Sequence, residues 1–310
     1  MNGVVIVDKP AGITSHDVVD RVRILLGVKK AGHTGTLDPL ATGVLPVCVG
    51  EATKIAAFLA GDDKVYEATM RLGIRTDTQD MTGTVLAEQE PRVAEADIRS
   101  VLASFTGRIT QIAPRYSAVK VRGKALYKWA RKGIDVESPA REVEIREIVL
   151  RGIETPRVRF AVTCSKGTYI RTLCADAGER LGCGAALEGL RRTRSGPFRI
   201  EDAVRIEGDG DETIRAAMAG SLIPLRKALP GIGDILIPAS LEQKLVKGHQ
   251  PDMEGLAGLQ IPSLAAGDVV KFVSAEGRLV ALARMLVSTG EIASLAPGVQ
   301  AARILRVFNK

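Results

Sequence analysis

The twelve residues Gly32-His-Thr-Gly-Thr-Leu-Asp38-Pro-Leu-Ala-Thr-Gly43 are the most informative stretch of this chain. Three glycines and one proline punctuate the stretch too densely for a helix or a regular strand. Pro39 biases Asp38 toward an extended conformation and fixes the chain just after it. The sequence therefore predicts a stiff loop that presents one carboxylate, with His33 five residues earlier and an apolar, strand-like run over 44–49 directly after it. A tight turn whose aspartate bonds its own backbone also fits these residues.

The elements on either side of this loop follow from hydrophobic periodicity. Residues 3–8 are a predicted buried strand, and residues 64–72 alternate as a half-buried strand does. A helix over 15–26 begins with a capping box at Thr14 and Asp17 and ends at Gly27. We further expect helices near 51–60, 94–105, 124–132 and 168–181, and strands near 142–150, 157–164, 269–273, 279–283 and 301–308. Without regular β-α-β alternation, this order favours an α+β fold with a mixed sheet over a doubly wound one.

The charge of the chain suggests a polyanionic partner. The net charge is +7 and the pI is about 9.3. Seven Lys or Arg and no acidic residue lie between Arg115 and Lys132, and four arginines lie between Arg191 and Arg199. Clusters of this kind are an electrostatic footprint for nucleic acid, although a solvated basic surface without a special partner is the simpler alternative. Residues 230–310 hold eight basic and seven acidic residues, and the change of composition predicts a domain boundary near residue 230.

Other features of the composition indicate a cytoplasmic protein. Asp8 and Lys9 interrupt the early apolar run, so we expect no secretory signal. No stretch approaches the ~18 apolar residues that span a bilayer. The four cysteines lie far apart, with no Cys-x-x-Cys pair and no histidine at ligand spacing, so we expect no metal site and assign them to the core.

Several motifs together resemble one enzyme family. The stretch GHTGTLDPLATGVLP resembles the catalytic-aspartate motif of the TruB-type pseudouridine synthases, which isomerise uridine 55 in the T loop of tRNA. Three further matches follow the order of the family: Asp8-Lys-Pro-Ala-Gly-Ile-Thr-Ser15, Lys64-Val-Tyr-Glu-Ala68 and Gly167-Thr-Tyr-Ile-Arg171. The resemblance covers roughly residues 3–230. It implies a bacterial-type tRNA pseudouridine synthase, an isomerase that works on a flipped base.

The resemblance also implies roles for individual residues. Asp38 is the essential carboxylate, and Tyr66 and Arg171 complete the catalytic set. An arginine beside a carboxylate favours its ionised form. Residues that contact the substrate are expected to be His33, Tyr169, Leu190 and Lys9. On the residues alone, Arg171 could be solvated on a helix's first turn, each tyrosine and Leu190 could be core residues, and Lys9-Pro10 could be a structural turn.

The remaining expectations concern RNA binding and architecture. The resemblance implies a pseudouridine synthase catalytic domain over 1–229 with a mixed, mainly antiparallel sheet, and an insertion near 111–151 that grips RNA like a thumb. Residues 230–310 would be a small, β-rich, PUA-like RNA-binding domain. Contacts to the RNA backbone are expected from Arg115, Lys120, Lys124, Lys128, Arg191 and Arg192.

The reaction class sets what else the protein needs. Pseudouridylation involves no net redox change, and the chain has no dinucleotide-binding or Walker motif, so we expect no cofactor. The expected partner is the T-arm of tRNA, with no membrane, no metal and no obligatory protein partner, and the protein is expected to be a monomer. Two alternatives stay open: a non-catalytic protein that binds or folds tRNA, and a guide-RNA-dependent relative that acts on rRNA.

Overall fold

The structure is a computed structural model that describes residues 1–308. The strands of its largest sheet are β1 (Gly3–Lys9), β2 (Ala31–His33), β3 (Thr42–Val49), β4 (Lys64–Leu72), β7 (Gly107–Ile112), β10 (Ala140–Glu154), β11 (Arg157–Cys164), β12 (Ala185–Ser195), β13 (Phe198–Arg199) and β14 (Val204–Arg205). Two hairpins stand apart, β5 (Ile74–Thr76) with β6 (Val85–Glu88), and β8 (Lys120–Val121) with β9 (Lys124–Ala125). A second sheet contains β15 (Gly233–Leu236), β16 (Val269–Val273), β17 (Leu279–Met285) and β18 (Ala302–Val307).

The helices lie between these strands along the chain. They are α1 (Ser15–Leu26), α2 (Ala56–Leu59), α3 (Glu95–Ala103), α4 (Leu126–Ala130), α5 (Ile170–Arg180), α6 (Asp211–Gly220), α7 (Ala239–Val246) and α8 (Met253–Leu256). Three 3-10 helices are η1 (Gly50–Ile55), η2 (Ile200–Asp202) and η3 (Thr289–Ser294). No helix within residues 1–308 combines the length and the hydrophobicity that a membrane crossing would need.

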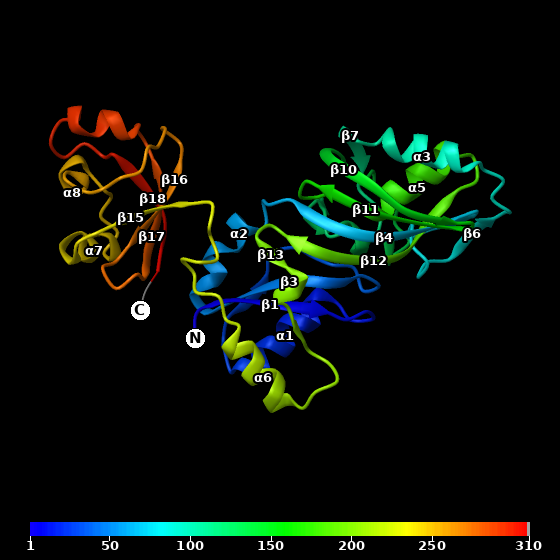
Figure 1. Ribbon diagram of the computed structural model, residues 1–310, viewed down its shortest axis with the longest axis horizontal. Helices are drawn as coiled ribbons and strands as arrows, with labels where there is room; N and C mark the ends of the chain where they lie inside the picture. The colour runs from blue at the N-terminus through cyan, green and yellow to red at the C-terminus, as the bar shows by residue number, and fades with distance from the viewer. Residues whose placement is uncertain (309–310) are drawn as a thin grey trace.

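The large sheet is mixed but mainly antiparallel, as predicted. Its main path runs β14-β1-β3-β12-β4-β11-β10-β7, and Figure 1 shows it curving away from the separate sheet β15–β18. The pairs β1–β14 and β3–β12 are parallel, and the other pairs are antiparallel. The mixed order confirms the α+β class.

The predicted helix start at Thr14 is confirmed in detail. The Thr14 hydroxyl accepts from the amide of Asp17 at 3.1 Å, and the Asp17 carboxylate accepts from the amide of Thr14 at 2.8 Å. Gly27 ends α1 in the left-handed conformation, with φ of 62°. This reciprocal cap satisfies amides that the first turn of a helix leaves without partners, so α1 begins at a defined residue near the loop that carries Asp38.

Alternate residues of the first strands serve two cores. Val5 and Val7 join the cluster that contains residues of α1, α3, α5 and α6, whereas Val4 and Ile6 face the opposite side. On that side Leu282 and Phe308 of the C-terminal part pack into the same cluster as Ile6. The second sheet is therefore attached through a hydrophobic contact, and it also has a core of its own.

The strand β12 was not among the expected elements, although it lies at the centre of the sheet between β3 and β4. Its sequence, Ala-Ala-Leu-Glu-Gly-Leu-Arg-Arg-Thr-Arg-Ser, contains a glycine and three arginines. Arginines are unusual in a strand with neighbours on both sides, because charged side chains there need buried partners. The four cysteines, by contrast, are free and buried, as predicted.

Candidate active site

The loop that carries Asp38 connects β2 to β3 and is anchored in the core by the residue before the aspartate. Leu37 is 3% exposed, and its amide and carbonyl bond the hydroxyl of Ser15 at 2.8 and 3.0 Å. Ser15 is the first residue of α1. Because its neighbour is fixed at both backbone polar groups, Asp38 has little freedom to move. The predicted stiff loop is confirmed.

Lys9, at the end of β1, binds the other side of this loop. Its side chain is buried, and Nζ donates to the carbonyls of Ala41 at 2.7 Å, Pro10 at 2.8 Å and Pro39 at 3.2 Å. Burial lowers the pKa of Lys9 to about 8, against the attraction of Asp38. All three protons of the ammonium group have backbone acceptors, so the expected contact of Lys9 with substrate is wrong. The lysine is part of a structural turn.

Arg171, in the first turn of α5, meets Asp38 as predicted. Its guanidinium is 4% exposed and places Nε 2.9 Å from Oδ2 and Nη2 3.4 Å from Oδ1 of Asp38. The Nε–H does not point along a hydrogen-bond direction, so the short contact is an ion pair by distance. Nη2 also donates to the carbonyl of Tyr116, and Nη1 to that of Thr78, both at 3.0 Å.

A second carboxylate, Asp80, lies on the far side of the same guanidinium and was missed in the sequence. It is 3% exposed, and its Oδ2 lies 3.4 Å from Nη1 of Arg171. Its other oxygen accepts from the hydroxyls of Thr78 and Thr82 and from the amide of Thr82. The residues Thr76-Asp-Thr-Gln-Asp80 resemble any polar turn, and the sequence contains no signal that this aspartate is buried.

The start of α5 is fixed from the neighbouring strand β7. Gln111 is buried, accepts from the amide of Tyr169 at 3.0 Å and donates to its carbonyl at 3.2 Å. An amide side chain that bonds both polar groups of one residue imitates a strand partner. It holds the residue two positions before Arg171, and so it fixes the direction in which the guanidinium leaves the helix.

The electrostatics of Asp38 are set mainly by burial. Burial raises the pKa of Asp38 above its ordinary value, Arg171 opposes that rise, and the like charge of Asp80 adds to it. We expected Arg171 to favour the ionised carboxylate, and it does so, but burial outweighs it and the pKa of Asp38 is raised. A carboxylate with a raised pKa is a stronger base than a solvated one, which suits a reactive group.

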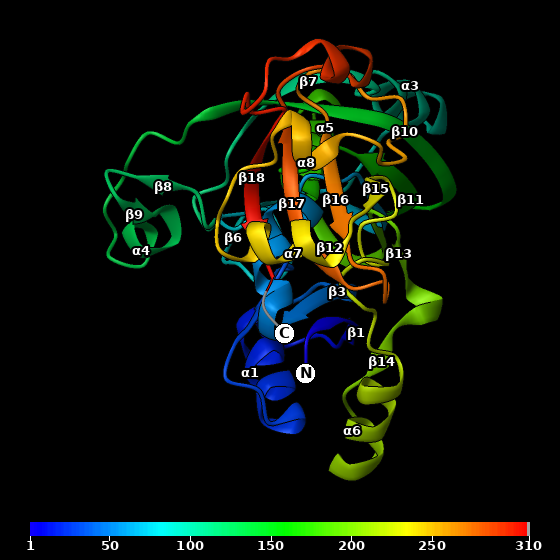
Figure 2. The same cartoon turned by 90° about the vertical axis from the view of Figure 1, so that its left-hand side faces the viewer.

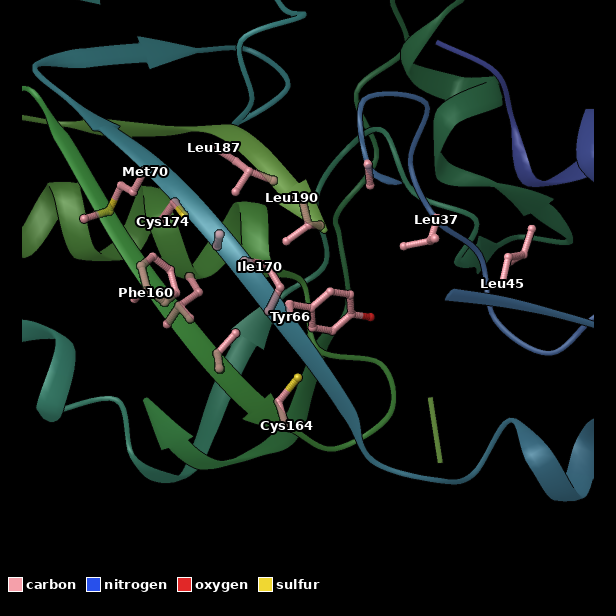
Figure 3. Packing of buried hydrophobic residues seen from close by; sticks show 14 of the residues in the cluster. Leu37, Leu45, Tyr66, Met70, Phe160, Cys164, Ile170, Cys174, Leu187 and Leu190 are labelled. Carbon is pink, nitrogen blue, oxygen red and sulfur yellow. The ribbon is translucent and has the colours of Figure 1, made fainter. Parts of the chain in front are cut away.

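Two apolar side chains from adjacent strands lie beside the loop. Tyr66 on β4 and Leu190 on β12 are each 9% exposed, and Figure 3 shows the hydroxyl of Tyr66 directed toward the segment that carries Leu37. Burial raises the pKa of Tyr66, so its hydroxyl stays protonated at neutral pH. The structure thus places Asp38, Tyr66, Leu190 and Arg171 around one region of the molecule.

Tyr169 and His33 lie at the edge of this region. The ring of Tyr169 is half-buried, and the guanidinium of Arg141 lies 5.3 Å from its centroid, a cation–π contact. His33 ends β2, and burial lowers its pKa, so its imidazole is neutral at pH 7. Its Nδ1 has no hydrogen-bond partner within residues 1–308. This nitrogen is itself buried and does not face solvent.

The basic residues of the insertion lie on a projecting hairpin. Figure 2 shows β8, β9 and α4 standing out from the body of the molecule. The exposed side chains there include Arg115, Lys120, Lys124 and Lys128. Arg115 forms an exposed ion pair with Asp135 at 3.4 Å, and the ammonium of Lys124 lies 5.1 Å from the ring centroid of Trp129.

Two of the three arginines of β12, Arg191 and Arg192, differ from the expectation. Arg192 is 1% exposed and donates to backbone carbonyls, so its expected contact with the RNA backbone is wrong. Arg191 is partly exposed but binds both carboxylate oxygens of Asp8, at 3.0 and 2.8 Å. Its charge is already paired. Among the described residues, no group of three or more His, Cys, Asp or Glu side chains is placed to hold a metal ion.

Comparison with known proteins identifies the source of these motifs. The model for the N-terminal domain of the TruB family of pseudouridylate synthases matches residues 23–170, and that for the C-terminal domain of tRNA pseudouridylate synthase B matches residues 171–229. The tRNA pseudouridine synthase B of Syntrophus aciditrophicus (strain SB) is 51% identical over 309 residues, which cover 100% of this chain and 99% of that protein. The tRNA pseudouridine synthase B of Geobacter sulfurreducens is 44% identical over 315 residues, with 100% of both chains covered.

A solved structure shares the fold. A chain in the crystal structure of a Cbf5-Nop10-Gar1 complex superposes with a TM-score of 0.72 at 31% identity. The match covers 98% of this chain and 84% of that chain.

The raised pKa of Asp38 predicts how stability depends on pH. A carboxyl whose pKa is higher in the folded than in the unfolded state destabilises the fold as pH rises above 3.8, its ordinary value, and this loss is complete above the folded pKa. The substitution Asp38→Asn removes the loss. Urea unfolding at pH 4 and pH 7.5 should show this variant becoming more stable relative to the parent as pH rises. A relative stability that moves the other way would mean that the attraction of Arg171 outweighs burial.

Proposed function

The chain belongs to the TruB family of pseudouridylate synthases, and from that premise we propose that it isomerises uridine 55 in the T loop of tRNA to pseudouridine. The observation that supports this most strongly is the contact between the Asp38 carboxylate and the Arg171 guanidinium beside Tyr66 and Leu190. The catalytic-aspartate motif lies within the matched family region. The residue roles below are part of the proposal.

The reaction makes modest demands on the protein. The N1–C1′ bond of uridine breaks, the uracil turns, and C5 joins C1′. The hydrogen on C5 then leaves as a proton, and N1 gains one. Atoms and electrons balance within the nucleoside and water, so no cofactor takes part. The enzyme must hold the base outside the stack, place a carboxylate at the sugar and exclude competing reactions.

Asp38 supplies the carboxylate. Its raised pKa makes it a better nucleophile toward C1′ or a better base toward the ribose, and either role starts with the ionised form. Arg171 keeps that form available, because a guanidinium stays protonated when it is desolvated. Its remaining donors bind backbone carbonyls and Asp80, which leaves the arginine no free orientation.

The flipped uracil would lie against Tyr66 and Leu190. The ring of Tyr66 offers a stacking face, and its protonated hydroxyl can donate to the base or assist proton transfer. Tyr169 would close the pocket from the start of α5. His33, with a neutral ring at the edge of the site, would help hold a displaced neighbouring nucleotide of the T loop.

The rest of the molecule would bind the RNA backbone. We assign residues 1–229 to the catalytic domain, with the insertion at 111–151 as the part that grips the T-arm through its exposed lysines. Residues 230–310, of which 309–310 lie outside the described part, would form the PUA-like domain, as their separate sheet and core suggest. We expect the protein to act in the cytoplasm as a monomer without an obligatory protein partner.

A non-catalytic tRNA-binding protein and a guide-RNA-dependent enzyme would each give different results from the proposed function. A protein that only binds or folds tRNA needs no carboxylate paired with a buried arginine, and the Asp38–Arg171 contact argues against it. The fold that is shared with the Cbf5 chain does not by itself separate the proposed activity from a guide-RNA-dependent one. An unmodified tRNA transcript without any other RNA or protein separates that activity from the proposed one.

Replacing Asp38 tests the proposed function directly. With tRNA labelled with tritium at C5 of uridine, the parent should release tritium to water. Asp38→Asn should lower the rate at least about 100-fold, the lower range for a well-placed catalytic group. Filter binding should give a similar tRNA affinity, because affinity comes from distributed basic contacts. Release near the parental rate in this variant would refute the assignment, and no release by the parent would refute the function.

The proposed role of the insertion is tested by the salt dependence of tRNA binding. Changing Lys120, Lys124 and Lys128 together to Gln should weaken tRNA binding and flatten the plot of log K against log salt. Each lysine that no longer neutralises a phosphate should lower the slope by about 0.9, with the value for duplex DNA as a guide. The matched control changes three exposed arginines outside the insertion, Arg23, Arg92 and Arg99, to Gln. If both triple variants keep the parental slope, the insertion does not contact the RNA backbone.

A further inference from the structure

Arg192 occupies the point where the catalytic loop returns to the sheet. On β12 it lies opposite Tyr66 of β4 and opposite Gly43 of β3. Gly43 has φ of +100°, and a Cβ there would stand 2.2 Å from the carbonyl oxygen of Arg192. Only glycine therefore allows the two backbones to approach this closely. The arginine side chain extends from this junction into the interior, where it is 1% exposed.

The guanidinium connects both ends of the loop that carries Asp38. Nε donates to the carbonyl of Val44 at 2.7 Å, after the loop. Nη2 donates to the carbonyl of Gly35 at 3.0 Å, and Nη1 lies 3.5 Å from that of Thr36, before the aspartate. A planar guanidinium can reach acceptors on two sides at once, which an ammonium group cannot do with the same geometry.

The charge of Arg192 has no counter-ion. Within residues 1–308, no carboxylate oxygen lies within 4.0 Å of its nitrogens, whereas Arg171 has Asp38 and Asp80, and Arg191 has Asp8. Burying an unpaired charge is costly, and an apolar side chain of similar volume would usually be cheaper at such a place. The carbonyls that it binds offset part of this cost. The cost of this unpaired buried charge therefore indicates that the loop segment bound by Arg192 needs to be held in place.

Arg192 and Lys9 hold different parts of the loop. Lys9 reaches it from β1 and binds the carbonyls of Pro39 and Ala41, after the aspartate. Arg192 reaches it from β12 and binds the part before the aspartate and the first buried residue of β3 beyond Gly43. Without the Arg192 side chain, Lys9 and Ser15 would still attach the loop, but residues 34–36 would have no guanidinium to tie them to the sheet.

We propose that Arg192 is a positioning residue for the reaction: by binding both ends of the catalytic loop, it holds the Asp38 carboxylate at Arg171 and within reach of a base that lies against Tyr66. It acts through the loop and does not touch the RNA. The inference rests on the proposed function for its kinetic consequence, whereas its effect on the loop stands independently.

The test compares Arg192→Met and Arg192→Lys with the parent. For the methionine variant we expect faster amide hydrogen exchange in residues 34–44, and a single-turnover tritium-release rate lower by about 100-fold, as small misplacements of reacting groups can produce. The tRNA dissociation constant and its salt slope should stay close to those of the parent. The lysine variant should be intermediate in rate and in exchange, because it keeps the charge but reaches fewer of the acceptors.

The control is Arg215→Met, which removes an exposed arginine from α6. It should leave the loop exchange and the single-turnover rate at the parental level. Urea unfolding establishes that each variant folds. If Arg192→Met does not fold, Arg192→Lys decides the question by the same readouts.

Two results would overturn the proposal. Parental exchange over 34–44, whatever the rate, would show that the loop does not depend on Arg192. A normal rate at saturating tRNA with a salt slope reduced by about 0.9 would instead place Arg192 on an RNA phosphate. If the parent itself forms no pseudouridine, the proposed function fails, but the exchange measurement still tests the contact between Arg192 and the loop.

Discussion

The contact between Asp38 and Arg171 is the interaction on which the rest of the site depends. It joins residues 133 positions apart in the chain, one on a loop and one on the first turn of α5. The guanidinium of Arg171 is 4% exposed and could not be buried without a charged partner at a small cost, whereas the Asp38 carboxylate is partly exposed and still has a raised pKa. The surrounding structure keeps the pair in place from both sides: Gln111 and Asp80 fix the arginine, and the loop is fixed by its own set of contacts.

The loop that carries Asp38 is held by two cationic side chains that do not take part in the Asp38–Arg171 pair. Lys9 and Arg192 are both buried, and both use their protons on backbone carbonyls on either side of Asp38. Their positive charges lie against the backbone of the loop that carries the Asp38 carboxylate. This arrangement uses charged residues for backbone geometry, and it leaves the exposed lysines of the projecting insertion for the proposed contact with RNA.

The sequence alone was enough to locate the loop that carries Asp38 and most regular elements. The features that it did not predict depend on which charged side chains become buried. The glycine and proline pattern around Asp38 is local, as are the capping residues of α1 and the alternation in β4. The partnership of Asp38 and Arg171 came from the resemblance to a family, because no spacing rule brings residues so distant into contact. The arginines of β12 look like surface charges in a one-dimensional pattern, so the strand was missed and Arg192 was assigned to the RNA. Asp80 lies in an ordinary polar turn, and only tertiary packing brings it to Arg171.

The most direct test of this arrangement is single-turnover chemistry of Arg171→Lys, with tRNA affinity measured on the same preparation. Lysine keeps a positive charge but not the planar fork that contacts Asp38, Asp80 and two carbonyls, and its pKa falls on burial. Leaving the carboxylates badly paired could cost on the order of 2–5 kcal/mol. We expect the rate to fall by a factor of roughly thirty to several thousand, with tRNA affinity nearly unchanged. Normal single-turnover chemistry with weakened binding would contradict this, and it would place Arg171 on the RNA backbone.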